Sequence, residues 1–262
     1  MLFVSDVHGA FEALRRLIDT GETVVVLGDL ANLTDYRNGR GAIADVLGID
    51  FARAASVARA AGDYEAMREL WTSHVGDRAH EVQSAIGQAV LAQYRDAAVA
   101  LDGGHGYVIH GNVDRPRHLS ESLPDGFEYM HGQARDINGL RFGFVGGGIQ
   151  TPLKADGEVS DEEMERLLSD LGPVDVLCTH VPPDVGALRG DVITGRQERG
   201  SGPIRDYLLE VQPKYHLFGD VHQPQATSWR IGRTRCFNAG YFRATGRFLE
   251  FRNSLVHTGR LG

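Results

Sequence analysis

The first residues in the chain that could do chemistry are Asp6 and His8, which follow the apolar run 2–4. Residues two positions apart on a strand point to the same side, so we expect this carboxylate and this imidazole to converge where the strand ends. Both groups are common metal ligands in proteins. The Asp-x-His pattern on its own is a weak indication of a metal site, because it also occurs by chance.

Four further stretches repeat this arrangement, each with polar residues directly after an apolar run. They are Gly28-Asp29, Gly111-Asn112, Thr179-His180 and Gly219-Asp220-Val221-His222. The glycines in three of them permit tight turns and close approach of the backbone. Buried charges are too costly to cluster unless metal ions compensate them. The five stretches together therefore indicate a metal centre built from residues between 6 and 222.

The elements that would position these residues alternate between strands and helices. Residues 1–5 and 23–27 form apolar runs, and residues 10–20 between them carry apolar side chains at helical spacing. A strand, a helix and a strand in succession predict a right-handed βαβ unit, whose ligands collect at the carboxyl ends of the strands. Other expected elements are strands at 107–110, 141–145, 174–178 and 215–218, helices at 160–171 and 202–211, and hairpins over 227–251.

Composition changes between Tyr36 and Gly104, where alanine is abundant and charges recur at helical spacing over 51–61 and 64–101. This pattern predicts a helical insertion, residues 36–104, within a single domain spanning residues 1–262. Breaks or bends in its helices are expected at Gly62, Gly76 and Gly87. Three roles remain open for the insertion: an accessory hairpin, a cap over the metal centre, or the contact surface of a homo-oligomer.

The overall composition restricts the partners of this protein. Its formal charge of -8 argues against long nucleic acids and anionic lipid surfaces. Cys178 and Cys236 are too few and too far apart for a disulfide framework. No apolar run reaches the length of a membrane span, and the N-terminal residues do not form a signal-peptide pattern. We therefore expect no membrane partner and a cytoplasmic location.

Taken in order, the five stretches resemble the motifs of the calcineurin-like metallophosphoesterases. That family's pattern is Asp-x-His, Gly-Asp-x-x-Asp, Gly-Asn-His-Asp/Glu, a lone His and Gly-His-x-His. Residues 237–240, Phe-Asn-Ala-Gly, are similar to the Asn-Pro-Gly turn that often follows. The resemblance implies an α/β fold, the four-layer αββα metallophosphoesterase sandwich, with two metal ions. It also implies a small phosphoester substrate, which a metal-bound hydroxide attacks in line with the leaving group.

The resemblance further implies that each ion has three ligands of its own and shares a fourth. The implied ligands are Asp6, His8 and His222 for the first ion, Asn112, His180 and Asp220 for the second, and Asp29 as the bridge. Asp29, Asn112 and His180 are also the residues expected to act in catalysis. Two ions about 3.5–4 Å apart can polarise a phosphoryl oxygen and generate hydroxide near neutral pH.

Asp220 departs from the family pattern, because it occupies the position of the first histidine in Gly-His-x-His. A carboxylate is a hard oxygen ligand, which favours manganese or iron, with zinc as the alternative. It also removes one positive charge from the site. This change weakens the binding of a phosphomonoester dianion more than that of a phosphodiester monoanion. The alternative interpretation is that Asp220 weakens binding of the second ion.

Val113 is a second departure, since many family members have a histidine there that binds phosphate and protonates the leaving group. General acid catalysis accelerates a reaction by about 10²–10⁴-fold. Asp114, which would orient that histidine, then has no evident partner.

Asn32 replaces the second acid of Gly-Asp-x-x-Asp, with Asp35 three places later. Candidates for the missing acid are His105, His131 and His216, and candidates for phosphate contacts are Arg115 and Arg117.

The sequence thus predicts a dinuclear metal-dependent phosphohydrolase, with small or nucleotide-type phosphodiesters as the favoured substrates. A phosphomonoesterase acting on nucleotides or proteins is the alternative enzyme. A protein phosphatase is disfavoured, because Asp29 lacks the Asp-Arg-Gly that would follow it. The alternative from another class is a non-catalytic scaffold of the same fold.

Overall fold

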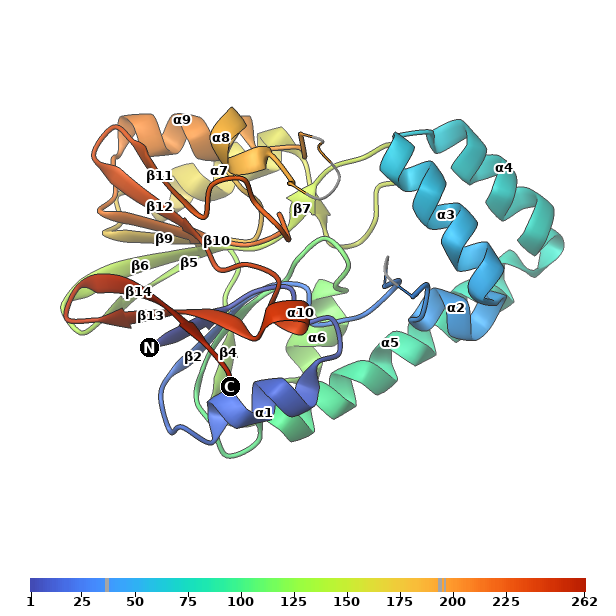
Figure 1. The fold of residues 1–262 in the computed structure, drawn as a ribbon, viewed down its shortest axis with the longest axis horizontal. Helices are drawn as coiled ribbons and strands as arrows, with labels where there is room; N and C mark the ends of the chain where they lie inside the picture. The colour runs from blue at the N-terminus through green and yellow to red at the C-terminus, as the bar shows by residue number, and fades with distance from the viewer. Residues whose placement is uncertain (36–37, 193–194, 196) are drawn as a thin grey trace.

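Two six-stranded sheets lie face to face with helices on the outer face of each (Figure 1). This is a computed structural model, and it describes residues 1–35, 38–192, 195 and 197–262. The two sheets with their flanking helices confirm the predicted four-layer αββα sandwich. Among the described residues, no helix is both long enough and apolar enough to cross a membrane.

The first sheet is parallel over its four strands β1 to β4 and ends in an antiparallel hairpin. In spatial order it comprises β14 (Leu255–Arg260), β13 (Arg247–Arg252), β1 (Leu2–Val4), β2 (Val24–Leu27), β3 (Gly106–Ile109) and β4 (Phe127–Tyr129). The strands predicted at 1–5, 23–27 and 107–110 correspond to β1, β2 and β3. Continuous burial of β2 on both faces explains its run of β-branched residues.

The second sheet has a parallel centre and two antiparallel edge strands. In spatial order it comprises β11 (Ser228–Ile231), β12 (Thr234–Asn238), β10 (Tyr215–Phe218), β9 (Val176–Thr179), β6 (Leu140–Val145) and β5 (Gln133–Ile137). A separate pair joins β7 (Gly148–Ile149) and β8 (Glu158–Val159). Phe3, Leu27, Phe144 and Leu217 are among the buried residues packed between the sheets.

Two helices cover each sheet through apolar side chains. Leu14 of α1 (Phe11–Ile18) and Val90 of α5 (Ala79–Leu101) belong to the core beside the first sheet. The second sheet is covered by α7 (Asp161–Leu171) and α9 (Gly202–Glu210). Ser160 caps α7, since its hydroxyl accepts from the Glu163 amide at 3.2 Å. Shorter helices are α6 (Pro116–Ser122), α8 (Gly186–Arg189) and α10 (Phe242–Thr245).

The helices between β2 and β3 include α2 (Ala42–Leu47), α3 (Ile49–Ala61), α4 (Tyr64–Val75) and the short η1 (Gly76–Arg78). Figure 1 shows α3 and α4 standing away from the sandwich at the far end of α5. Phe51, Ala55 and Met67 give them a small core of their own. The predicted breaks at Gly62 and Gly76 are confirmed, whereas Gly87 lies inside α5. Tyr36, the predicted start of the insertion, lies outside the described residues.

Candidate metal centre

The predicted ligands lie in loops that directly follow β1, β2, β3, β9 and β10. These loops meet at one edge of the sandwich, because the strands before them are parallel within each sheet. Two groups of side chains have ligand atoms within 4.8 Å of one another: Asp6 with His8 and His222, and Asp6 with Asp29 and His180. The fold therefore brings together residues from positions 6 to 222.

Asp29 is the side chain at the middle of this cluster. Its Oδ2 atom lies 3.6 Å from Nε2 of His8 and 3.5 Å from Nε2 of His180. Asp220 is also close to this cluster, with Oδ1 3.6 Å from the same His180 nitrogen. Nε2 of His222 lies 3.2 Å from Oδ1 of Asp6. Asp29 thus lies between His8, of the first predicted ligand set, and His180, of the second. The assignment of these ligands to two ions stays a prediction.

The backbone of the ligand loops adopts an unusual conformation. Asp6, His8, Asp29 and Asp220 have φ angles of 58°, 42°, 57° and 65°, in the left-handed region that non-glycine residues rarely occupy. Because β1 ends at Val4, strand alternation is the wrong reason for the convergence of Asp6 and His8. A tight turn brings them together, with 3.7 Å between His8 Nε2 and Asp6 Oδ1. Such backbone strain is typical of functional sites.

Two glycines are required because side chains of the loop after β1 and of Asp29 lie directly over them. A Cβ atom at Gly111 would lie 2.1 Å from Oδ1 of Asp29. A Cβ atom at Gly219 would lie 1.8 Å from Oγ of Ser5 and 2.9 Å from Oδ2 of Asp6. Any larger side chain at either position would displace a predicted ligand.

Asp114, for which the sequence gives no partner, organises the loop after β2. Its carboxylate accepts hydrogen bonds from the backbone N–H groups of residues 29–31 at 2.8, 3.3 and 3.0 Å. It also accepts from the Gly111 amide at 2.9 Å and from the hydroxyl of Tyr94 at 3.2 Å. Tyr94 lies on α5, so this helix supports the loop that carries Asp29.

Asp35 and Asn32, the residues near the missing second acid, hold the neighbouring loops. Asp35 pairs with Arg243 at 2.9 Å, and Arg243 also donates to the backbone carbonyl of His8. The backbone of Asn32 exchanges two hydrogen bonds with the side chain of Gln93, at 2.6 and 3.1 Å. Both residues therefore help to position the loops that carry predicted metal ligands.

The turn at residues 237–240 positions the last ligand. The Asn238 amide donates to the carbonyl of Val221 at 3.0 Å, and its oxygen accepts from the Gly240 amide at 2.6 Å. The ring of Tyr241 stacks on His222, with ring centroids 4.0 Å apart and an interplanar angle of 7°. These contacts fix the orientation of the His222 imidazole.

Burial and mutual contact shift the pKa values of the cluster. Burial opposes ionisation of Asp6, but the imidazoles of His222 and His8 outweigh it and hold the pKa of Asp6 well below its usual range. Burial likewise disfavours protonation of His180, yet the Asp29 carboxylate raises the pKa of His180 well above its usual value. Burial raises the pKa of Asp220 to about 6, against the opposing effect of His180.

The donor set fits divalent metal ions. Oδ1 of Asp6 and Nε2 of His8 are buried, and neither has a hydrogen-bond partner among the residues that the structure describes. His222 approaches that carboxylate oxygen at 3.2 Å, but not in hydrogen-bonding geometry. Buried carboxylates beside unpaired imidazole nitrogens are costly unless a cation lies between them. Carboxylate, imidazole and amide groups are the ligand types that manganese, iron and zinc share.

Comparison with known proteins agrees with this geometry. The family model for calcineurin-like phosphoesterases matches residues 1–224. The chain belongs to this family. A search of curated proteins finds no match.

Solved structures show the same fold for this calcineurin-like phosphoesterase. One crystal structure superposes with a TM-score of 0.66 at 16% sequence identity, covering 100% of this chain and 98% of the other. A second, the protein TT1561 of Thermus thermophilus, gives a TM-score of 0.53 at 14% identity, covering 99% and 97%. Membership of this family indicates metal-dependent hydrolysis of a phosphoester, and it leaves the identity of that ester open.

The stability of the metal-free phosphoesterase should fall as the pH rises above 6.5, the ordinary pKa of histidine. Folded His180 and His8 have raised pKa values, so they keep protons that the unfolded chain releases. Their contribution is fully present below pH 6.5 and is lost as the pH rises through the folded pKa values. Asp220 acts with the same sign between its ordinary pKa of 3.8 and about 6.

Thermal unfolding in EDTA, followed across this pH range, measures the effect. Metal ions bind deprotonated imidazoles, so added Mn²⁺ should stabilise the phosphoesterase more at higher pH. The unfolding temperature should then rise with pH instead of falling. His180→Gln should flatten the EDTA profile, while the exposed His80→Gln should leave it unchanged. A metal-free protein that gains stability above pH 6.5 would contradict this prediction.

The candidates for a replacement acid lie outside the two ligand groups. His105 contacts Thr23 at 3.0 Å, His131 accepts from the Gly146 amide at 3.2 Å, and His216 bonds to Thr179 at 2.8 Å. Burial lowers the pKa of His216 to about 3. Of the two arginine candidates, Arg117 is exposed and pairs with Glu121 at 2.9 Å. The guanidinium of the other, Arg115, packs against Gly87 of α5.

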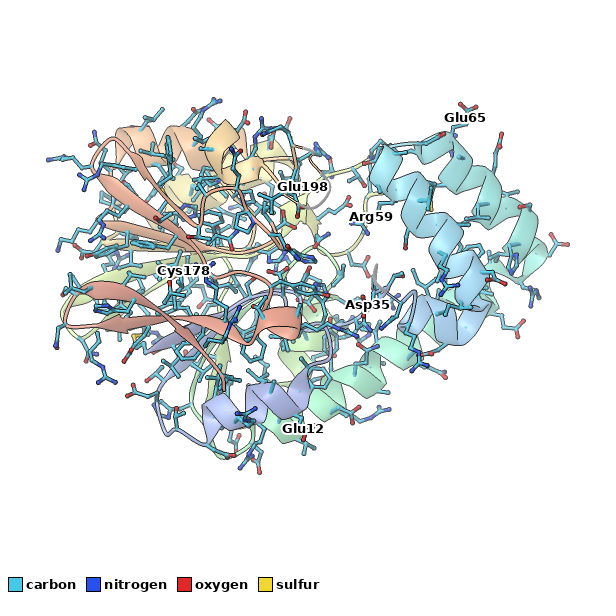
Figure 2. The ribbon with its side chains drawn as sticks, viewed as in Figure 1. Glu12, Asp35, Arg59, Glu65, Cys178 and Glu198 are labelled. Atoms are coloured by element: carbon cyan, nitrogen blue, oxygen red, sulfur yellow. The ribbon has the colours of Figure 1, made fainter. Side chains whose placement is uncertain are left out.

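One residue near the cluster, Arg59, was missed by reasoning from the sequence. It lies in the last turn of α3, and Figure 2 places it between that helix and the sandwich. Its Nη2 atom lies 2.9 Å from the end of the Asn112 side chain. The sequence carries no local signal for this, because Arg59 resembles the other charged residues of an alanine-rich helix.

Proposed function

We propose that this protein hydrolyses small or nucleotide-type phosphodiesters with the help of two manganese or iron ions. Asp6, His8 and His222 would hold one ion, Asn112, His180 and Asp220 the other, and Asp29 both. Two such ions supply Lewis acidity toward a phosphoryl oxygen and activate water for in-line displacement.

Asp220 is the observation that carries the diester preference. It places a third carboxylate beside Asp6 and Asp29, where a histidine would contribute no negative charge. A site with less positive charge loses more affinity for a dianionic monoester than for a monoanionic diester. Val113 adds to this preference for weakly charged or activated esters, because its side chain has no proton to give to a leaving alkoxide.

A phosphomonoesterase is the second candidate, favoured by the guanidinium of Arg59 beside Asn112. A guanidinium near a predicted ligand favours a substrate with more negative charge. Both candidates use the same ligands and differ in the charge of the phosphoryl group that binds best.

The test compares hydrolysis of bis(p-nitrophenyl) phosphate and p-nitrophenyl phosphate by the manganese-loaded protein. A higher kcat/KM for the diester supports the proposal, and a higher value for the monoester reverses the ranking. If the purified protein binds no metal and cleaves neither ester, the non-catalytic scaffold of the same fold is favoured instead. Bound metal is measured on the same samples, so that loss of metal is not mistaken for substrate preference.

Asp220→His tests the charge argument directly. Restoring a neutral ligand should raise the ratio of monoester to diester activity by about 10-fold, the effect of one charge in a partly screened site. Asp77→His, at an exposed position of η1, is the matched control and should not change the ratio. An unchanged ratio in Asp220→His at full metal occupancy would count against the role of this carboxylate in selectivity.

A further inference from the structure

His216 is a fully buried residue of β10, the strand that leads to the predicted ligand Asp220. Its Nε2 atom lies 2.8 Å from the hydroxyl of Thr179, which ends β9 directly before His180. Strands β9 and β10 are parallel neighbours in the second sheet. The contact therefore joins these two strands just before the loops that carry His180 and Asp220.

The hydrogen bonds of Thr179 define which nitrogen of His216 carries the proton. A hydroxyl has a single hydrogen to donate, and that of Thr179 goes to the carbonyl oxygen of Val181 at 2.8 Å. Nε2 of His216 must therefore donate to the hydroxyl, which leaves Nδ1 as the unprotonated acceptor. Nδ1 is buried and has no hydrogen-bond partner among the residues that the structure describes. Burial lowers the pKa of His216 to about 3, so the ring stays neutral at neutral pH.

The unpaired Nδ1 atom makes His216 an unfavourable choice for the core alone. A buried acceptor without a donor destabilises the folded chain. The ring stacks on Phe218, with centroids 4.9 Å apart, and Phe218 belongs to the apolar core beside α7 and α9. A leucine at this position would fill similar space and leave no polar atom unpaired. The hydrogen bond from Nε2 to Thr179, which no apolar residue can make, gives the histidine its purpose.

This hydrogen bond acts on the backbone at both sides of His180. Thr179 precedes His180, and the carbonyl that the Thr179 hydroxyl binds belongs to Val181, the residue that follows. Nδ1 of His180 donates to the carbonyl of Leu27 at 2.7 Å, so its Nε2 atom is directed to the ligand cluster. That atom lies 3.5 Å from Oδ2 of Asp29. A shift of the turn 179–181 would therefore move Nε2 away from the predicted second ion.

We propose that His216 is a positioning residue for the second metal ion. Through the Thr179 hydroxyl, it holds the turn 179–181 so that Nε2 of His180 stays directed at that ion. This inference rests on the proposed function, because it assigns His180 to a metal ion. The first ion should not depend on His216, since its own predicted ligands, Asp6, His8 and His222, lie in other loops.

The direct test is a calorimetric titration of the metal-free full chain with Mn²⁺, which gives a Kd for each ion. His216→Leu should raise one of the two Kd values about 10- to 100-fold, the usual effect of losing a group behind a metal ligand, and leave the other unchanged. Thr179→Val, which removes the hydroxyl but keeps the branched shape, should raise the same Kd. The matched control is His105→Leu, because His105 makes a similar contact to Thr23 at 3.0 Å, where β2 and β3 begin.

Two amide variants separate the hydrogen bond from packing. In His216→Gln the NH₂ group can take the place of Nε2 and donate to Thr179, because both nitrogens are equally far from Cβ along the side chain. In His216→Asn the shorter side chain ends near the place of Nδ1. We expect the glutamine variant to keep the Kd values of the wild type and the asparagine variant to behave like His216→Leu. A glutamine variant that binds manganese no better than the asparagine variant overturns the inference.

The Tm in EDTA is measured for each variant. His216→Leu removes the unpaired Nδ1 and leaves the Thr179 hydroxyl bonded to Val181, so its Tm should not fall. A contact that is only structural would lower the Tm and leave both Kd values unchanged, which overturns the inference. If the leucine variant does not fold, Thr179→Val is held to the same criterion, with Thr179→Ser as the variant that should keep the wild-type affinity.

Turnover, measured separately, distinguishes this inference from the proposed function. A protein whose second ion depends on His216 but which cleaves neither nitrophenyl ester supports the inference and overturns the proposed function. A protein that cleaves one of the esters, with both Kd values independent of His216, overturns the inference alone. A wild-type protein that binds no manganese overturns both.

Discussion

Asp29→Ala is expected to lose both metal ions, and its rate of phosphoester hydrolysis should fall at least about 10³-fold below that of the wild type. Removing even one electrostatic donor from an active site lowers the rate by about 10²–10³-fold. The Oδ2 atom of Asp29 lies within 3.6 Å of His8, in the first ligand set, and within 3.5 Å of His180, in the second. Without it, His180 loses the carboxylate that does most to raise its pKa, and His8 keeps Asp6 but loses the second carboxylate that raises its pKa. Metal analysis by mass spectrometry and kcat/KM on the better nitrophenyl ester measure the two effects.

The structure also supplies suitable controls for this variant. Asp29→Asn keeps an oxygen ligand but removes the charge, so it should retain part of the metal that the alanine variant loses. Asp125→Ala removes an exposed carboxylate and should leave metal content and turnover unchanged. A metal-replete, active Asp29→Ala protein would refute the bridging role, while the family assignment, which rests on residues 1–224, would stand.

The fold and the ligand cluster could be predicted because their signals are local. The β-branched run of β2 is followed by Gly28 and Asp29, and the apolar run of β3 by His110, Gly111 and Asn112. Each strand and its predicted ligand are therefore close together in the sequence. Parallel strands then bring such ends to one edge of a sheet. The convergence of Asp6 and His8 was predicted for the wrong reason, since it depends on two positive φ angles that residue types do not reveal.

The position of Arg59 and the role of Asp114 could not be predicted, because both depend on contacts between distant segments. Arg59 sits in a helix whose charges look like an ordinary solvated face, and only the placement of α3 brings it to Asn112. Asp114 has no signal in its own neighbourhood, since most of its donors lie in the loop after β2 and on α5. Asp114 therefore has a structural role of its own, although Val113 replaces the histidine that it would orient in the family pattern.

That structural role predicts a large loss of stability in Asp114→Ala. The carboxylate is 1% exposed and accepts from four backbone N–H groups and one hydroxyl. Each buried donor left without a partner costs about 1–3 kcal/mol, so we expect the free energy of unfolding to fall by about 4 kcal/mol or more. Typical domains are stable by only about 5–15 kcal/mol. Urea unfolding of the metal-free protein measures the loss.

Smaller changes around the same carboxylate separate this effect from simple loss of volume. Tyr94→Phe removes one of the donors and the acceptor for the Arg115 amide at 2.7 Å, and should cost about 1–2 kcal/mol. Asp114→Asn keeps one accepting oxygen but turns an NH₂ group toward backbone donors, so its stability should lie between those of Tyr94→Phe and Asp114→Ala. If Asp114→Ala unfolds at the same urea concentration as the exposed control Asp125→Ala, the loop after β2 is held by other contacts. In that case, any loss of metal in the Asp114 variants would have to come from the changed charge beside Asp29.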